Sequence, residues 1–236
     1  MKPAFRFKQF SISDDHCAMK LSGDAVLLGA ISEPGQSQYI LDIGTGCGIL
    51  ALMLAQKSQA MIDAVEIDTS SAKQASHNFQ QSIWHDRINI HHDSIMDYAE
   101  KCSKKYDCII CNPPYFQGQL KSSCPAKSNA RHNSSLDFGQ LCHCVNRLLS
   151  ETGTFWAIMP VSEKNNFLKA FLTGGLYCFK NIFISDKPDR EPKRLISCFS
   201  FSLPESVSDK TLILKNTDNS PSADFIALTK DFYPKF

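Results

Sequence analysis

Residues 39–55 read YILDIGTGCGILALMLA, in which a glycine-rich turn joins two apolar segments without a break. The segment before the turn has the composition of a buried strand, and the longer segment after it has that of a buried helix. Glycine adopts backbone conformations closed to other residues, so such a turn lets the backbone come close to a ligand. We therefore take Gly44, Gly46 and Gly48 as candidate cofactor-binding residues at the end of a strand in an α/β sheet.

The spacing of this turn argues against a dinucleotide. Gly-x-Gly-x-Gly is tighter than the Gly-x-Gly-x-x-Gly fingerprint of pyrophosphate sites, and Asp42 stands just before it. A carboxylate at that point repels phosphate groups. Asp42 therefore favours a cationic nucleoside as the ligand of the turn.

Two further strands are predicted to end in carboxylates. Residues 61–68, MIDAVEID, end in Glu66 and Asp68, and residues 88–92, INIHH, are followed by Asp93. In α/β nucleotide sites an acid at this point holds the ribose hydroxyls, so Glu66 is the expected ribose ligand and Asp68 the second choice. Asp93 reaches the same edge and is expected to accept from an adenine amino group. The alternative is that Asp93 caps the next helix.

A fourth predicted strand, residues 106–111, leads into Asn112-Pro113-Pro114-Tyr115. The prolines keep the chain extended and donate no backbone hydrogen bonds, so carbonyl oxygens stay free as acceptors. Asn112 adds a side-chain carbonyl and Tyr115 an aromatic face. Acceptors beside an aromatic ring suit a nucleobase with an amino group, which makes Asn112, Pro113 and Tyr115 the candidate catalytic residues. The alternative is a rigid turn with a packed tyrosine.

The composition bounds the class of protein. The 236 residues, 43% of them hydrophobic, fit one domain, 1–236, with an N-terminal extension, 1–38, and a catalytic core, 39–236. No apolar stretch is long enough to cross a bilayer and the N-terminus lacks a secretory signal, so we expect a cytoplasmic protein with reduced cysteines. Cys108 and Cys111 would point to opposite faces of their strand, which argues against a shared metal, and we expect no metal site.

The net charge is +1, but the charges are unevenly distributed along the chain. Residues 21–100 carry ten acidic and three basic side chains, whereas residues 101–150 carry seven basic and two acidic ones. This partition suits a cationic small molecule on one side of Asn112 and a polyanion on the other. The alternative is chance variation among solvated faces. The basic residues that we expect to contact nucleic acid are Lys121, Lys127, Arg131, Lys187, Arg190, Lys193 and Arg194.

The rest of the chain alternates predicted strands and helices. Strands are expected at residues 5–10, 153–159, 178–185, 195–203 and 210–214, and helices after Ser22 or Asp24 as cap, at 136–149, at 162–172 with Ser162 as cap, and at 222–232. Residues 116–134 lack periodicity and read as a loop beside the site. The predicted fold class is α/β: a doubly wound, Rossmann-like, mostly parallel seven-stranded sheet with an antiparallel final strand and a small N-terminal extension.

Taken together, the glycine turn with Asp42, then Glu66, Asp93 and Asn112-Pro113-Pro114-Tyr115 resemble motifs one to four of the class I S-adenosylmethionine methyltransferases that modify amino nitrogens. Further segments are similar to the bacterial tRNA(Val) N6-methyladenine transferases, which modify the adenine 3′ of the anticodon. These segments are FKQF at 7–10, CAMK at 17–20, LALMLAQ at 50–56 and ALTKDFY at 227–233. The similarity is patchy at residues 116–134 and 186–194.

The resemblance implies a reaction, a cofactor and a partner. The glycine turn would hold the methionine moiety of S-adenosylmethionine, Glu66 the ribose and Asp93 the adenine, with Lys20 and Asn112 also at the cofactor. A flipped adenine of a tRNA would give its N6 protons to the Asn112 side chain and the Pro113 carbonyl while stacking on Tyr115. Methyl transfer would be a direct displacement that needs no metal. We expect a monomer.

Three other functions share parts of this pattern. A protein glutamine-amide methyltransferase would have Asn-Pro-Pro-Tyr, but that family carries a helical N-terminal domain, and only about forty residues precede the glycine turn here. A DNA adenine methyltransferase usually has a target-recognition domain, which the sequence does not suggest. A non-catalytic RNA-binding relic would be expected to lose the glycines or Asn112.

Overall fold

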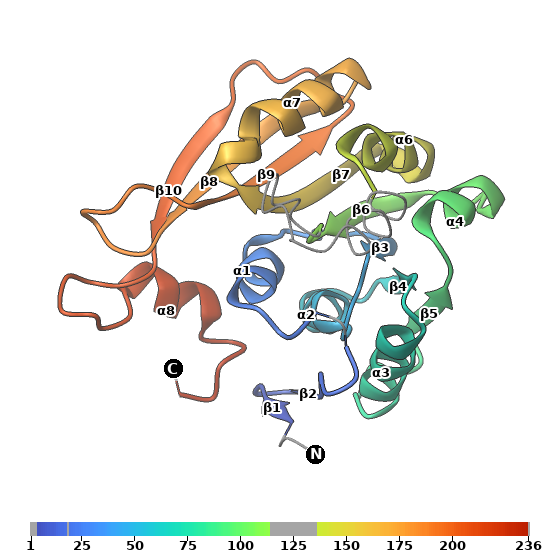
Figure 1. The fold of residues 1–236 in the computed structure, drawn as a ribbon, viewed down its shortest axis with the longest axis horizontal. Coiled ribbons are helices and arrows are strands. Elements are labelled where there is room, and N and C mark those ends of the chain that lie inside the picture. The colour runs from blue at the N-terminus through green and yellow to red at the C-terminus, as the bar shows by residue number, and fades with distance from the viewer. Residues whose placement is uncertain (1–3, 18, 114–135, 236) are drawn as a thin grey trace, which may run out of the picture.

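The computed structural model describes residues 4–17, 19–113 and 136–235. Its centre is a sheet of eight strands in the order β10-β8-β9-β7-β6-β3-β4-β5, drawn in Figure 1. The strands of this sheet are β3 Tyr39–Ile43, β4 Met61–Glu66, β5 Ile88–His92, β6 Tyr106–Cys111, β7 Leu149–Pro160, β8 Tyr177–Ser185, β9 Arg194–Ser200 and β10 Ser208–Ile213.

The sheet confirms the predicted α/β class and corrects two of its details. Strands β5, β4, β3, β6 and β7 run parallel, and β9 is antiparallel to both of its neighbours, β7 and β8. The sequence analysis predicted seven strands with the last one antiparallel, but β10 is an eighth strand and pairs parallel with β8. After β9 the chain crosses over β8 and adds β10 at the outer edge of the sheet, where β10 runs parallel to β8.

Helices cover both faces of the sheet, as the two core clusters and Figure 1 show. One face packs against α4, α6 and α7, and the other against α1, α2, α3 and the C-terminal segment that contains α8. Cys108 belongs to the core on the side of α1, α2 and α3, and Cys111 belongs to the core on the side of α4, α6 and α7. This confirms that the two thiols point to opposite faces of β6. The helices are α1 Gly23–Ile31, α2 Ile49–Lys57, α3 Thr69–Gln80, α4 Ile95–Lys101, α6 Phe138–Leu148, α7 Lys164–Thr173 and α8 Ala223–Thr229.

Of the two helix caps predicted from the sequence, the one at α1 is confirmed and the one at Ser162 is wrong. Ser22 caps α1 by accepting from the Ala25 N–H at 3.2 Å, and Ser222 caps α8. Asp137 forms a capping box with Gln140 at α6. Ser162 was wrong as a cap, because it lies in a single 3-10 turn, Val161–Glu163, before α7 begins. Among the described residues, no helix is long and apolar enough to span a membrane.

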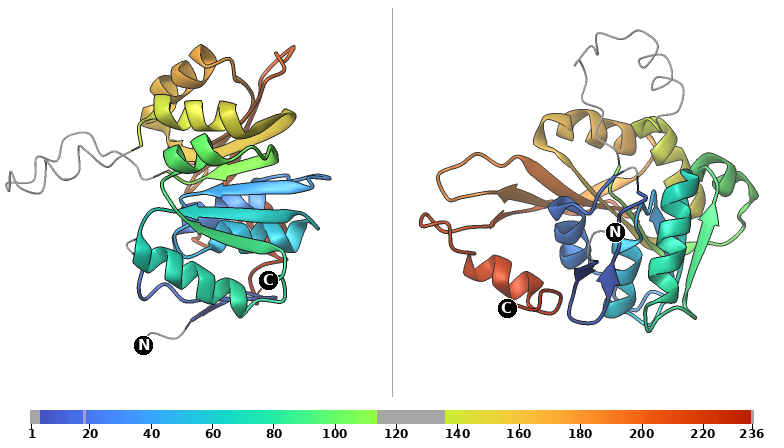
Figure 2. Two further views of the ribbon diagram at one scale, coloured as in Figure 1. Left: turned by 90° about the vertical axis from the view of Figure 1, so that its right-hand side faces the viewer. Right: turned by 60° about the horizontal axis from the view of Figure 1, so that its bottom comes forward.

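The N-terminal extension forms a hairpin rather than the single strand predicted for residues 5–10. Strands β1 Phe5–Arg6 and β2 Ser11–Ile12 pair antiparallel around a turn in which the Phe7 N–H donates to the Phe10 carbonyl at 2.9 Å. The turn lets the Phe7 and Phe10 rings stack at 4.6 Å and bury themselves against the core. The termini meet here, because the Lys8 N–H donates to the Phe232 carbonyl at 2.8 Å (Figure 2).

Candidate active site

The winding of the sheet reverses between β3 and β6. From β3 the chain proceeds through β4 to β5 on one side, and β6 and β7 lie on the other. Ile43 and Cys111, the last residues of β3 and β6, are register partners, so Gly44 and Asn112 leave the sheet from neighbouring strand ends. In open α/β sheets ligands bind outside the carboxyl ends of the strands at such a switch point. The fold therefore brings together the glycine turn and Asn112, which lie far apart in the sequence.

The three glycines of the turn have positive φ angles and two different environments. The φ values are 67° at Gly44, 58° at Gly46 and 88° at Gly48. A Cβ added at Gly44 or Gly46 would meet no atom within 4 Å, so these positions border open space. A Cβ at Gly48 would lie 2.4 Å from Cε1 of Phe79. Gly48 therefore lets α3 pack against the turn, while Gly44 and Gly46 leave room for a ligand.

Asp42 supports the turn from inside the protein. Its side chain is fully buried, and Oδ2 accepts from the Thr45 hydroxyl at 2.5 Å and from the Ala51 N–H at 3.1 Å. Burial raises the pKa of Asp42 to about 7. The two hydrogen bonds lower the pKa and so oppose this rise, whereas the nearby Glu66 carboxylate adds to it. Oδ1 is buried without a hydrogen-bond partner among the described residues. Asp42 thus links β3, the turn and α2, and direct contact with a cofactor stays a prediction.

Glu66 joins the ends of β3 and β4. Its Oε2 accepts from the Gly46 N–H and its Oε1 from the Asp68 N–H, each at 2.9 Å. A carboxylate has about four acceptor positions, so each oxygen can still accept a hydroxyl. The predicted second choice, Asp68, is engaged as the cap of α3, where it accepts from the N–H and hydroxyl of Ser71. These contacts favour Glu66 for ribose hydroxyls.

Asp93 lies at the same edge of the sheet and is paired there. Its backbone N–H donates to the Glu66 carbonyl at 3.2 Å, and its carboxylate forms an ion pair of 2.9 Å with Lys101. Lys101 lowers the pKa of Asp93. Ser94, not Asp93, caps α4, so the helix-cap alternative for Asp93 was wrong.

The structure describes the first two residues of the Asn112-Pro113-Pro114-Tyr115 motif. Asn112 is half-buried and Pro113 is buried where the chain leaves β6. Pro114, Tyr115, the 116–134 loop and the basic residues Lys121, Lys127 and Arg131 lie outside the described residues. The structure thus places Asn112 and Pro113 after the end of β6, next to the strand end from which the glycine turn leaves. Their roles as acceptors, and the roles of Tyr115 and the loop, stay predictions.

The Lys20 side chain bonds back to the backbone of the segment that precedes it. Its Nζ donates to the Asp14 and Asp15 carbonyls at 2.7 and 3.0 Å. This segment is fastened to the glycine turn by the buried Asn78, whose Nδ2 donates to the Ser13 and Cys47 carbonyls, both at 2.8 Å. Lys20 therefore shapes a segment next to the turn, and its contact with a cofactor stays a prediction.

The basic loop between β8 and β9 lies on the same edge of the sheet as Asn112, because β8 runs in the direction of β6 and β7. Lys187 donates to the Thr217 carbonyl at 3.3 Å. Arg194 forms an ion pair of 2.7 Å with Asp24, so its charge is partly compensated. This edge can present positive charge to a polyanion through Lys187, Arg190 and Lys193.

Comparison with known proteins assigns the family. Residues 18–133 match the model of the methyltransferase small domain. The chain is 42% identical over 233 residues to a protein of Phocaeicola vulgatus, covering 98% of this chain and 97% of that one. It is 41% identical over 236 residues to a protein of Trichodesmium erythraeum, covering 98% of each. Both relatives are named tRNA1(Val) (adenine(37)-N6)-methyltransferase. The chain belongs to this methyltransferase family.

Solved structures agree on the fold of the methyltransferase. A predicted O-methyltransferase of Agrobacterium tumefaciens superposes with a TM-score of 0.68 at 17% identity, covering 88% of this chain and 96% of that one. A glycopeptide N-methyltransferase complexed with S-adenosylmethionine superposes with a TM-score of 0.58 at 10% identity, covering 81% and 100%. At these identities the likeness shows the shared fold alone.

Two residues close to the predicted site of the methyltransferase escaped the sequence analysis. Ile67, between Glu66 and Asp68, is 63% exposed and offers an apolar surface at the end of β4. The sequence does contain a signal for Ile67. It is a large apolar residue between two acids that follow the strand, at a point where the apolar residues of the buried strand have ended. Asn78 lies on α3 beside Phe79, and nothing in its local pattern indicates a bond to Cys47, 31 residues away in sequence.

Proposed function

We propose that this methyltransferase transfers the methyl group of S-adenosylmethionine to N6 of adenine 37 in tRNA(Val). The observation that carries the reaction is the position of Asn112 beside the glycine turn at the switch point of the sheet. The names of relatives with about the same length and 42% or 41% identity support the substrate.

The residues at this edge fit the cofactor. The open space above Gly44 and Gly46 accommodates a ligand close to the backbone, and Glu66 keeps acceptor positions for ribose hydroxyls. The exposed side chain of Ile67 suits an apolar contact with the adenine ring, and Asp93 lies beyond it as an acceptor. When bound, S-adenosylmethionine supplies an electrophilic methyl group. The acidic residues at the edge favour its cationic sulfonium over a phosphorylated nucleotide.

Asn112 and Pro113 act on the target adenine. Their carbonyl oxygens accept hydrogen bonds from the two N6–H groups, which withdraws the nitrogen lone pair from the ring and makes it available for attack. Tyr115 stacks on the base once it has left its own stack. Because the acceptors are held at the end of a rigid strand, catalysis comes from positioning and electrostatics.

The RNA is held by its backbone. We assign this contact to Lys187, Arg190 and Lys193 on the described edge, and to Lys121, Lys127 and Arg131 outside the described residues. The logarithm of tRNA affinity should then fall linearly with the logarithm of salt concentration, by about 0.7 to 0.9 for each phosphate contacted. Cytoplasmic location, a monomeric state and independence of metal stay predictions from the sequence.

Methylation of total tRNA from a strain lacking the enzyme tests the proposal. We expect N6-methyladenine in one tRNA species, and charge reversal of Lys187, Arg190 and Lys193 should raise the KM for tRNA without changing cofactor affinity. A glutamine-containing peptide serves as the alternative substrate. Methylated peptide with inert tRNA would establish the glutamine-amide reaction instead, and RNA binding without any methyl transfer would establish the non-catalytic alternative.

A further inference from the structure

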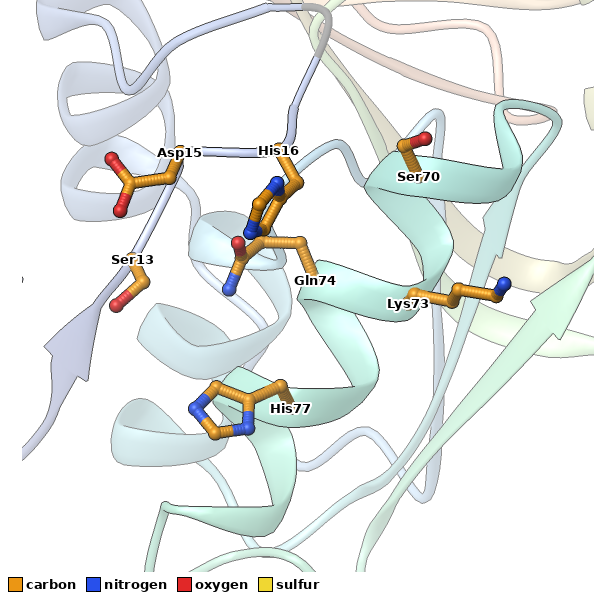
Figure 3. A pocket seen from close by; sticks show the side chains of 7 residues that line it. All are labelled: Ser13, Asp15, His16, Ser70, Lys73, Gln74 and His77. Carbon is orange, nitrogen blue, oxygen red and sulfur yellow. The ribbon is translucent and has the colours of Figure 1, made fainter. Parts of the chain in front are cut away.

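A hollow of about 450 Å³ lies on the outer side of the cofactor edge, between the N-terminal segment and α3. The N-terminal segment contributes three of the lining residues and one face of α3 contributes the other four (Figure 3). The lining residues are Ser13, Asp15, His16, Ser70, Lys73, Gln74 and His77. Ser70 stands in the first turn of α3, four residues after Glu66, so the hollow begins at the cofactor edge and continues down the helix.

The side chains of this hollow have no partners within the part of the chain that the structure describes. Gln74 is the clearest case, because it is only 6% exposed and yet its amide makes no hydrogen bond to a described residue. Figure 3 shows Gln74 and His77 extending from α3 toward the segment that carries Ser13 and His16. The amide of Gln74 therefore opens into the hollow, where it can donate a hydrogen bond to a ligand and accept one from it.

The chemistry of the lining favours an anion with a neighbouring hydroxyl. The ammonium of Lys73, the amide of Gln74, the imidazoles of His16 and His77 and two serine hydroxyls are all able to donate hydrogen bonds. Asp15 is the one acidic member of the lining, and its ionised carboxylate can only accept hydrogen bonds. Within the described ranges, no group of three or more His, Cys, Asp or Glu side chains can hold a metal ion. A ribose–phosphate unit has the matching groups, since its phosphate accepts and its 2′-hydroxyl donates.

We propose that this hollow is a subsite for one ribose–phosphate unit of the RNA substrate, at the edge of the sheet that carries Glu66. The proposal rests on the proposed function and extends it to a face of the protein that the charge distribution did not suggest. Gln74 and His77, which extend in the same direction in Figure 3, contact the phosphate, Lys73 adds positive charge at the rim, and Asp15 accepts from the 2′-hydroxyl. The bonds of Asn78 to Ser13 and Cys47 hold both walls of the hollow to the glycine turn, so the subsite keeps a fixed position relative to the cofactor.

Binding of an RNA stem-loop that carries the target adenine tests the subsite. The double variant Lys73→Ala, His77→Ala should bind the stem-loop about three- to tenfold more weakly, and its salt slope should fall by about 0.7 to 0.9. Gln74→Met changes no charge, so it should weaken binding about two- to tenfold while leaving the slope unchanged. The matched control is Lys169→Ala with His143→Ala, because both are exposed helix residues of α7 and α6 on the opposite side of the sheet.

Cofactor affinity distinguishes the subsite from the cofactor site. S-adenosylhomocysteine should bind the wild type and all of these variants equally in calorimetry. If RNA affinity is unchanged in both hollow variants while the wild type methylates tRNA, the subsite is wrong and the proposed function stands. If the variants lose cofactor affinity in parallel, the hollow belongs to the cofactor site and the subsite is again wrong. A wild type that neither binds nor methylates RNA overturns both proposals.

The role of Asp15 is tested with a changed ligand. A stem-loop with 2′-deoxyribose throughout should bind the wild type more weakly than the RNA does, and Asp15→Ala should reduce that difference. Equal discrimination by the wild type and Asp15→Ala would remove Asp15 from the subsite.

Discussion

Glu66 and Gly46 are joined by a hydrogen bond of 2.9 Å from the Gly46 backbone N–H to the Glu66 carboxylate. The bond fixes the middle of the glycine turn, at the end of β3, to the end of the neighbouring strand β4. One carboxylate therefore supports the turn and, by our proposal, holds the ribose of the cofactor. Loss of this side chain should change both the turn and the ligand contact.

Glu66→Ala should weaken S-adenosylhomocysteine binding by about 1.5 to 3 kcal/mol, the range for hydrogen bonds to a charged group. Isothermal calorimetry measures the change directly. The matched control is Glu151→Ala, an exposed acid at the far end of β7, which should bind as the wild type does. An affinity of Glu66→Ala equal to that of the control would contradict the ribose assignment.

Asn112→Ala should reduce methyl transfer by about 100-fold or more, because a preorganised group at a reacting centre typically contributes that much. Cofactor affinity should stay close to that of the wild type, since we assign Asn112 to the target nitrogen. Single-turnover methylation of tRNA gives the rate, and Asn165→Ala on the exposed side of α7 is the control. Retention of more than about a tenth of the wild-type rate would argue against this role.

Alanine at Gly46 and at Gly48 should have different effects, although both positions have positive φ. Each substitution should cost about 1 to 2 kcal/mol of unfolding free energy for the left-handed backbone. Gly48→Ala should lose about 1 to 3 kcal/mol more, because its Cβ would meet Phe79 at 2.4 Å. Gly46→Ala should instead weaken cofactor binding, because its Cβ enters the open space.

Urea unfolding and calorimetry separate these two effects. Phe79→Leu combined with Gly48→Ala provides the internal test, since relief of the contact makes the double variant more stable than the sum of the single changes predicts. Strict additivity would show that Phe79 does not limit the side chain at position 48.

Asp42 should make stability depend on pH. Its pKa is about 7 in the folded protein and 3.8 in a model peptide, so the folded state keeps a proton that the unfolded state releases between these values. The stabilisation is therefore complete below about pH 4 and is lost as the pH rises to about 7. The full change is on the order of 4 kcal/mol.

Thermal unfolding at pH 5 and pH 8 measures this effect. Asp42→Asn cannot titrate, so its melting temperature should fall less between the two pH values than that of the wild type, whatever its absolute stability. Asp86→Asn, at an exposed position, should keep the wild-type difference. The assignment fails if Asp42→Asn and the wild type show the same dependence on pH.

The sequence by itself determined the parts of the site that depend on local pattern. A strand, a glycine turn and a helix in YILDIGTGCGILALMLA, and acids at the ends of the next two strands, follow from periodicity and from the conformational freedom of glycine. These signals placed Glu66, Asp93 and Asn112 on one edge, since parallel strands bring their carboxyl ends together.

Only the tertiary structure decided which groups within that edge face inward. Gly44 and Gly48 are equivalent in the motif, but Phe79 of α3 packs against Gly48 and leaves Gly44 open. Asp42 precedes the turn as a candidate ligand, yet α2 and Thr45 enclose it.

The hollow on α3 likewise depends on contacts between distant segments. Asn78 joins Ser13, 65 residues earlier in the chain, to Cys47, and so brings Asp15 and His16 opposite Gln74. Periodicity indicates which face of a helix is buried. It does not indicate which segment packs against that face, because that segment can lie far away in the sequence.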